Sequence, residues 1–207
     1  MAIDLNKALE EIRKQKKRNF DQSIDLIVNL KKFNPRKNPI NLLVKVPHKT
    51  KDKKICGFFN EKSKIVDCIT KAEFAKYSNK KKLKKLVKNY DYFIAIANLM
   101  PAVATNFGKV LGPAKKMPSP QLGIIPNQDE KTINAIISKI NSTARVVTRD
   151  EACIKINVGK QSMKDKEIIE NIKAVYKEII NALPIKKENI KNSLIKSTMG
   201  KPIKVQI

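Results

Sequence analysis

A regular alternation of apolar and polar residues between Phe20 and Lys31 constrains the fold of this chain more than any other feature. From Ile24 to Leu30 every second residue is apolar, and the residues between them are mostly polar. This period of two is typical of a β-strand with one face against a core and the other face open. One strand does not make a sheet with a covered face, so its partners must come from other parts of the chain.

Both ends of the chain supply partners of this kind. Strands are predicted at residues 41–46, 152–158, 190–196 and 202–207, and amphipathic helices at residues 4–17 and 164–182. Each end alone has too few strands for a covered sheet, whereas two helices on one face of their combined, mainly antiparallel sheet would be stable. We therefore expect an α+β two-layer split domain formed by residues 1–51 and 149–207.

The middle of the chain, residues 52–148, predicts a separate domain inserted into the first. Strands are expected near residues 54–59, 65–69, 91–97 and 144–147, with helices at 71–90, 99–107 and 128–140 between them. The nearly continuous apolar run from Asp91 to Ala97 is typical of a strand buried on both faces of a parallel sheet. Alternating strands and helices indicate a small α/β domain, so the overall class is α/β.

The charge of the chain indicates a polyanionic partner. Lysine and arginine number 44 against 19 aspartate and glutamate residues, which gives a net charge of +25. A field of this size attracts nucleic acids and anionic membranes. Codon bias toward lysine, isoleucine and asparagine would also enrich lysine, but it does not explain the scarcity of acidic residues. No apolar run approaches the ~20 residues of a membrane span, and the N-terminus lacks a secretory signal, so we expect a cytoplasmic protein.

Metal and thiol chemistry have little support. Cys56, Cys68 and Cys153 are widely spaced, and His48 is the sole imidazole. These groups do not form a zinc motif, and they are expected to be buried free thiols in a reducing compartment. We therefore expect no metal site.

Nucleotide binding and catalysis are also poorly supported. The Gly108–Pro118 segment lacks the Gly-Lys-Ser/Thr ending of a P-loop and the glycine spacing of a dinucleotide turn. Asp21 and Asp25 have no second carboxylate pair to complete an acid–base set. We expect no catalytic residue and no cofactor. Two alternatives stay open: an RNA-directed enzyme or nucleotide-binding factor that uses the middle domain, and a nonspecific DNA-coating protein.

Two segments carry residue types suited to nucleic-acid binding. Glycine lets a backbone approach ribose and phosphate closely or adopt a positive φ, hydroxyl groups bond to 2′-hydroxyls or phosphates, and Phe and Met offer apolar surface to bases. Lysine and arginine add charge. The candidate contacts are Arg18, Phe20 and Ser23 at the first strand, and Ser193, Lys196, Ser197, Thr198, Met199 and Gly200 at the C-terminal turn. Composition alone does not distinguish RNA from DNA.

Several ordered motifs resemble a known family nearly from end to end. They are Phe20-Asp21-Gln22-Ser23, Val46-Pro47-His48, Gly108-Lys109-Val110-Leu111-Gly112-Pro113 with Lys116-Met117-Pro118, Val158-Gly159-Lys160, and Ser197-Thr198-Met199-Gly200. The chain resembles the universal family of the large-subunit ribosomal protein numbered one, which builds the mobile lateral stalk, in its archaeal branch.

The resemblance implies a fold and a function. A domain built from both chain ends would carry the principal RNA site, and an inserted Rossmann-like domain would bind no dinucleotide. Members of the family hold an element of large-subunit rRNA at the stalk, move as deacylated tRNA leaves the exit site, and repress translation of their own mRNA. The implied partners are large-subunit rRNA, its own mRNA and, transiently, exit-site tRNA. The protein would be a monomer when free and would otherwise be bound to the ribosome.

The family's RNA contacts carry over by motif. The matching residues are Phe20, Ser23, Ser193, Thr198, Met199 and Gly200, and Lys160 in the Val158-Gly159-Lys160 motif joins them. The chain departs from the family at Ala114-Lys115-Lys116, at Lys201 before Pro202, and in a shortened segment between Phe59 and Ile65.

Overall fold

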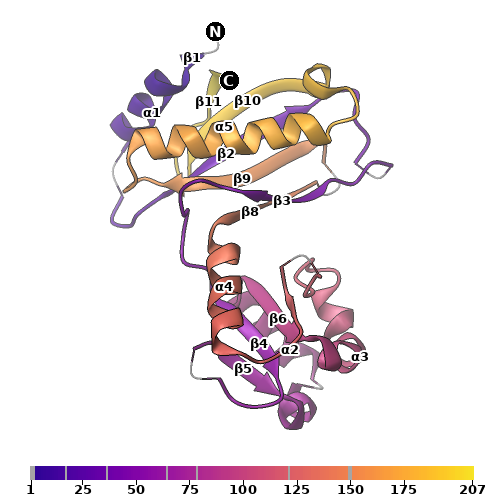
Figure 1. Ribbon diagram of the computed structural model, residues 1–207. Coiled ribbons are helices and arrows are strands. Elements are labelled where there is room, and N and C mark those ends of the chain that lie inside the picture. Colours follow the sequence, from indigo (N-terminus) through magenta and orange to yellow (C-terminus); the bar gives the residue numbers. More distant parts are fainter. Residues whose placement is uncertain are drawn as a thin grey trace. The chain divides into compact units, whose positions relative to one another are not determined.

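The computed structural model of the protein describes residues 3–16, 18–35, 37–63, 65–77, 79–120, 122–148 and 151–207. The chain divides into two compact units (Figure 1). The end-built unit contains Met1–Lys51 and Ser142–Ile207, and the inserted unit contains Asp52–Asn141. No helix in the described ranges combines the length and apolar character needed to cross a membrane.

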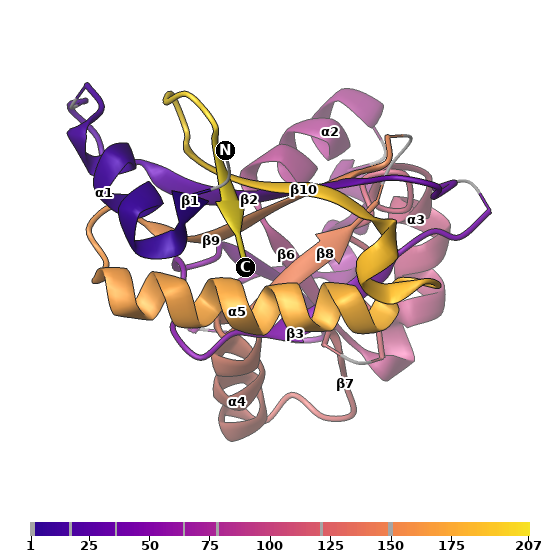
Figure 2. The ribbon, with the colours of Figure 1, turned by 90° about the horizontal axis from the view of Figure 1, so that it is seen from above.

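The sheet of the end-built unit takes strands from both ends of the chain. Its order is β1-β11-β10-β2-β9, and only β1 and β11 are parallel. The N-terminal strand β2 therefore lies between two C-terminal strands, and β1 lies beside β11 (Figures 1 and 2). The strands are β1 (Ile3–Asp4), β2 (Ser23–Leu30), β9 (Cys153–Lys160), β10 (Ile190–Ser197) and β11 (Ile203–Gln206).

Two helices, α1 (Leu5–Lys14) and α5 (Asp165–Ala182), cover the same face of this sheet (Figure 2). Asp4 caps α1 by accepting a hydrogen bond from the Leu5 N–H at 2.9 Å. The apolar set of β2, from Ile24 to Leu30, is buried in one core with the apolar stripe of α5. The alternation in β2 therefore separates the face that α1 and α5 cover from a face that the described helices of this unit leave open.

A second pair of strands completes the core of the end-built unit. β3 (Asn41–Lys45) pairs antiparallel with β8 (Thr143–Val147), and Val44 and Val146 are buried in the same core as β2 and α5. The expected strand near 144–147 therefore exists, but it pairs with β3 rather than joining the middle domain. The division falls at residue 142 instead of 149, and residues 149 and 150 lie outside the described ranges. The five-residue sequence of this strand does not indicate which sheet it joins.

The inserted unit is built on a parallel sheet. Its order is β5-β4-β6-β7, which in chain order is 2-1-3-4 and is typical of doubly wound α/β folds. The strands are β4 (Ile55–Phe59), β5 (Asp67–Thr70), β6 (Tyr92–Ile96) and β7 (Ile124–Ile125). Only residues 60–66 separate β4 from β5, and the described residues among them form no helix, as the shortened segment in the sequence predicts.

Alternate residues of the two central strands enter different cores. Phe58 and Phe93 stack at 5.7 Å between ring centroids in a core with α2 and α3, whereas Ile94 and Phe59 belong to a core with α4. Burial on both faces explains the continuous apolar run in β6 and confirms the α/β class. The helices are η1 (Lys71–Tyr77), α2 (Lys80–Asn89), η2 (Ala97–Leu99), α3 (Met100–Leu111) and α4 (Glu130–Asn141), while η3 (Lys186–Asn189) belongs to the end-built unit.

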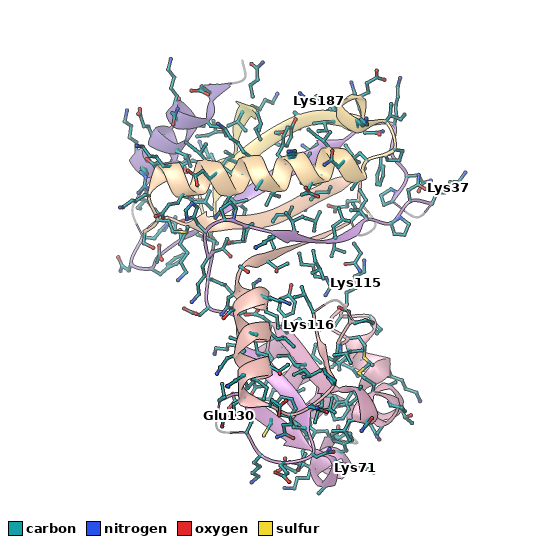
Figure 3. All side chains as sticks on the ribbon, in the orientation of Figure 1. Lys37, Lys71, Lys115, Lys116, Glu130 and Lys187 are labelled. Carbon is teal, nitrogen blue, oxygen red and sulfur yellow. The ribbon has the colours of Figure 1, made fainter. Side chains whose placement is uncertain are left out.

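The Gly108–Pro118 segment has a structural contact at the end of α2. α3 continues through Gly108 to Leu111, and the chain then turns so that Lys116 reaches the preceding helix (Figure 3). The Lys116 ammonium donates to the main-chain carbonyls of Val87 and Tyr90, each at 2.7 Å. A cation at a helix C-terminus interacts favourably with the dipole and satisfies carbonyls that have no partner within the helix.

Lys116→Met is expected to lower the free energy of unfolding by about 1–2 kcal/mol, because two charge-assisted hydrogen bonds are lost and the methionine retains the apolar stem. Urea unfolding followed by circular dichroism measures this loss. Lys109→Met, at an exposed position of α3, is the matched control and should change stability little. Equal stability of the two variants would contradict the anchoring role of Lys116.

Candidate nucleic-acid interface

Three segments that are distant in sequence meet at one end of the five-stranded sheet. Ser23, at the start of β2, pairs with Lys160 at the end of β9, and Ile24 pairs with Ser197 at the end of β10. The segment before β2, the turn after β9 and the turn between β10 and β11 therefore share one edge. Antiparallel pairing of strands from both chain ends creates this meeting point.

Thr198 fastens the β10–β11 turn to the start of β2. Its N–H donates to the Ser23 carbonyl at 3.0 Å, and its Oγ1 accepts from the Ser23 N–H at 3.1 Å. The hydroxyl also donates to the Ser23 carbonyl at 3.2 Å. One side chain thus satisfies the main-chain groups at the end of the ladder and orders the turn.

Gln22 connects the same turn to the turn after β9. It is 4% exposed, and its Oε1 accepts from the Met199 N–H at 3.2 Å. Its Nε2 donates to Gln161 Oε1 at 3.4 Å, and its carbonyl accepts from the Gln161 N–H at 2.8 Å. A buried amide with partners on both sides fixes the two turns relative to each other.

Gln15, just after α1, holds the far side of the β10–β11 turn. Its Oε1 accepts from the Lys201 N–H at 3.2 Å, and its Nε2 donates to the Lys201 carbonyl at 3.3 Å. Gly200 lies directly against this contact, since an added Cβ would be 2.0 Å from Gln15 Oε1 and 2.2 Å from Ser197 Oγ. Gly200 does not have a positive φ, so close approach, here to other parts of the protein, is what requires a glycine.

Two large apolar side chains are exposed beside this ordered turn. Phe20 is 53% exposed and Met199 is 61% exposed, and among the described residues only Ile65 and Ile185 are comparable. Phe20 precedes Gln22 by two residues, and Met199 is hydrogen-bonded to Gln22. Exposed aromatic and apolar side chains on a rigid frame are suited to stacking against unpaired bases.

The charges around the turn are partly balanced within the protein. Lys160 Nζ lies 3.6 Å from Asp21 Oδ2, and Asp21 also accepts hydrogen bonds from the N–H and hydroxyl of Ser162 at 3.1 and 2.9 Å. Lys196 lies opposite Asp25 on the ladder. Burial raises the pKa of the Asp25 carboxyl, while the charge of Lys196 and a hydrogen bond from Asn157 act in the opposite direction. Lys160 and Lys196 therefore already face carboxylates.

Arg13 of α1 braces the turn after β9, a role that the sequence pattern did not indicate. Its guanidinium donates to Asp165 Oδ1 at 2.6 and 2.8 Å and to the carbonyls of Gln161 and Met163 at 2.9 and 2.7 Å. This fork joins α1, the turn and the first residue of α5. Helical spacing marks Arg13 only as part of a basic last turn, so its partners about 150 residues away were not predictable.

Most of the predicted contact residues lie together at this edge. Ser23, Lys160, Thr198, Met199 and Gly200 line the meeting point, and Phe20 and Arg18 are exposed in the segment leading to it.

Two predicted hydroxyl contacts differ from the expectation. Ser193 is 5% exposed and Ser197 is 2% exposed, and both lie on the helix-covered face of β10. Residues two apart on a strand share a face, so Ser193, Ile195 and Ser197 are buried together and Lys196 points to the opposite face. Ser197 acts beneath the turn, where its carbonyl accepts from the Gly200 N–H at 3.1 Å. Ser193 is four residues away from the turn along β10.

Side chains elsewhere that could take part in a reaction are bound or buried within the protein. His48 Nε2 lies 2.6 Å from Glu170 Oε2, and the His48 N–H donates to Asn171. Burial raises the pKa of the Cys56 thiol to about 12, which keeps it protonated and unreactive. Within the described ranges no three His, Cys, Asp or Glu side chains are grouped to hold a metal ion.

Comparison with known proteins gives consistent matches along the chain. A model of the ribosomal protein L1p/L10e family matches residues 12–201. The large ribosomal subunit protein uL1 of Pyrobaculum islandicum is 36% identical, covering 96% of this chain and 91% of the relative. The proteins of the same name from Nanoarchaeum equitans and Pyrococcus horikoshii are 34% and 33% identical, covering 95% and 100% of this chain and 97% and 98% of the relatives.

Proposed function

The chain belongs to the ribosomal protein L1p/L10e family, and from this premise we propose that it binds large-subunit rRNA through the edge formed by Phe20–Ser23, Lys160 and Thr198–Gly200. The protein is a structural ribosomal protein and not an enzyme. The names of its relatives place them in the large ribosomal subunit, and we assign this chain the same location.

One observation carries the proposed site. Phe20 and Met199 expose large apolar surfaces next to an ordered turn. The side chains of Thr198, Gln22 and Gln15 hold this turn through hydrogen bonds to main-chain groups. An exposed apolar side chain gains from burial against a base, and a turn ordered before binding loses little conformational entropy on binding. The combination supports recognition of an RNA loop or bulge with accessible bases.

Affinity and specificity have different sources in this proposal. The net charge of +25 attracts phosphate without distinguishing sequences. The turn supplies fixed main-chain groups and apolar surface at defined positions, which an RNA must match in shape. Lys160 contributes less than an isolated lysine because Asp21 already balances part of its charge.

The finer functions follow from the resemblance described above. In this proposal the protein holds rRNA at the mobile lateral stalk and assists release of deacylated tRNA from the exit site. It also represses translation of its own mRNA when that mRNA presents a copy of the rRNA element. Both RNAs would use the same edge, so rRNA and mRNA would compete for the protein.

The test is filter binding of the chain to an rRNA fragment from the stalk and to random RNA and duplex DNA of equal length, at one fixed salt concentration. The proposal expects affinity for the stalk fragment at least about 10³-fold higher than for the others, as for specific nucleic-acid binding in general. Equal affinity for all three would contradict specific rRNA binding and would favour a nonspecific coating protein.

Thr198→Val is expected to weaken binding to the stalk fragment by about 1 kcal/mol, because the hydroxyl that fastens the turn to Ser23 is lost while the side-chain shape is kept. Filter binding with thermal melts measures this effect. Thr198→Ser is the matched control, since it retains the hydroxyl and should bind nearly as the natural chain does. Weaker binding by Thr198→Ser together with unchanged binding by Thr198→Val would show that the methyl group, and not the hydrogen bonds, matters.

A further inference from the structure

The helix α2 of the inserted unit carries an unusual surface. It contains six lysines and no acidic residue within ten positions, while Leu83, Leu86 and Val87 form its buried side. Lys81, Lys84, Lys85 and Lys88 are exposed and follow the spacing i, i+3, i+4, i+7, so they form one stripe along the helix. We call these four residues the α2 lysine stripe.

The stripe is unfavourable for the isolated helix. Like charges three or four residues apart destabilise a helix by about 0.2–0.5 kcal/mol per pair. Lys81 lies in the first turn, where the helix dipole favours anions, and no acidic residue is present there. None of the four stripe lysines forms an ion pair. An external anion near the stripe would therefore offset this repulsion.

Lysine-rich composition alone does not explain the stripe. The longer helix α5 also contains several lysines, but Asp165 and Glu167 occupy its first turn and further glutamates lie among its lysines. The same chain thus intersperses both signs of charge on one helix and excludes acids from the other. A general codon bias would affect both helices alike.

The helix that carries the stripe is held at both ends. Lys116 donates to the carbonyls of Val87 and Tyr90, next to Lys88, and the Asn79 side chain caps the other end by accepting from the Lys81 N–H at 2.9 Å. The helix rises about 1.5 Å per residue, so the stripe extends for about 10 Å. The helix backbone therefore holds the four lysines in a linear array.

We propose that the α2 lysine stripe is a second RNA-contacting surface, which binds the phosphate backbone and does not read sequence. A row of ammonium groups with no aromatic or amide side chain among them matches regularly spaced phosphates and offers nothing that distinguishes bases. The inference rests on the proposed rRNA-binding function and assigns the inserted unit a share in it.

The experiment compares the full chain with a variant in which the four stripe lysines are replaced by glutamine. A matched control replaces Lys37, Lys173, Lys177 and Lys187, four exposed lysines of the end-built unit, of which Lys37 and Lys187 are labelled in Figure 3. Glutamine and lysine have similar helix propensity, so folding should be retained. Filter binding to the stalk rRNA and to random RNA is measured over a range of salt concentrations.

The natural chain should show a slope of log affinity against log salt of about −4 to −8. In the stripe variant the size of this slope should fall by about 2. Its affinity for both RNAs should fall by the same factor, about tenfold or more near 0.1 M salt. The control should change the slope by less than about 1, and a variant with arginine at the four stripe positions should bind like the natural chain.

Two outcomes overturn the proposal. One is a stripe variant with the same slope and affinity as the control. The other is a stripe variant that keeps its RNA affinity but loses binding to vesicles containing phosphatidylserine, which would indicate a membrane-directed surface. Failure of the proposed rRNA function is a separate result, because it appears in the natural chain as a lack of preference for stalk rRNA over random RNA.

Discussion

Gly200→Val should weaken binding to the stalk rRNA fragment by about 2 kcal/mol or more, while binding to random RNA changes little. The first side-chain carbon would occupy the space of Gln15 Oε1 and Ser197 Oγ, at 2.0 and 2.2 Å. Gln15 would then have to leave Lys201, with loss of two hydrogen bonds, and the turn that presents Met199 would shift. The ratio of the two affinities, measured by filter binding at one salt concentration, reports this effect.

Two further variants separate the possible causes. Gly108→Val is the matched control, because an added Cβ at Gly108 has no atom within 4 Å. Adding Gln15→Ala to Gly200→Val removes one obstacle, so the two substitutions should be non-additive if the clash is internal to the protein. Additive effects would instead place the steric conflict with the RNA. An unchanged affinity ratio in Gly200→Val, with the variant folded, would show that the turn is not the specific site.

A fusion of residues 1–51 to 142–207 through a short Gly/Ser linker is expected to fold and to keep its preference for stalk rRNA. The join is short because the Lys53 N–H, two residues after Lys51, donates to the Oδ1 of Asn141 at 3.2 Å, and Asn141 is next to Ser142. A fusion that resumes at residue 149 lacks β8, which removes the buried Ala144 and Val146 and the Thr148 hydroxyl that accepts from the Ile40 N–H at 2.8 Å.

The loss of β8 should lower the free energy of unfolding by on the order of 3–5 kcal/mol, from lost apolar burial and an unsatisfied buried N–H. Urea unfolding compares the two fusions directly. Equal stability would mean that β8 does not contribute to this core. If the fusion at residue 142 is unfolded by circular dichroism, the end-built unit does not fold independently.

Much of the fold follows from local pattern. The alternation in β2, the apolar stripe of α5 and the continuous apolar run of β6 each indicate an element and its burial, and the structure contains all three. Combining strands from both chain ends into one sheet followed from the number of strands that a covered face requires. The comparisons confirm the resemblance to the archaeal branch of the family and the expectation of a ribosomal protein without enzymatic function.

Which sheet a given strand joins was harder to predict from the sequence. β8 is only five residues long and its sequence does not indicate which sheet it joins, so only its pairing with β3 places it in the end-built unit. β7 has two residues within a Gly/Pro-rich segment, which is too short to give a period. Such assignments depend on contacts between distant residues, which local sequence does not record.

In the site, as in the fold, some residues had a local sequence signal and others depended on contacts with distant parts of the chain. Phe20, Thr198 and Met199 were predicted from their chemistry and from the family motifs, and they lie at one edge. Gln22 had a usable signal, since it is a polar residue on the apolar face of the predicted strand. Gln15 and Arg13 had none, because their partners are about 150 to 190 residues away. Ser193 was grouped with the turn although strand alternation directs it into the core.

Co-sedimentation with large ribosomal subunits tests the central claim most directly. Subunits stripped of their own copy of this protein are mixed with the natural chain or with Gly200→Val and separated on a sucrose gradient at moderate salt. The account predicts that the natural chain sediments with the subunits in a ratio near one to one and that the variant stays largely at the top. A natural chain that stays at the top, or a variant that sediments equally well, would contradict it.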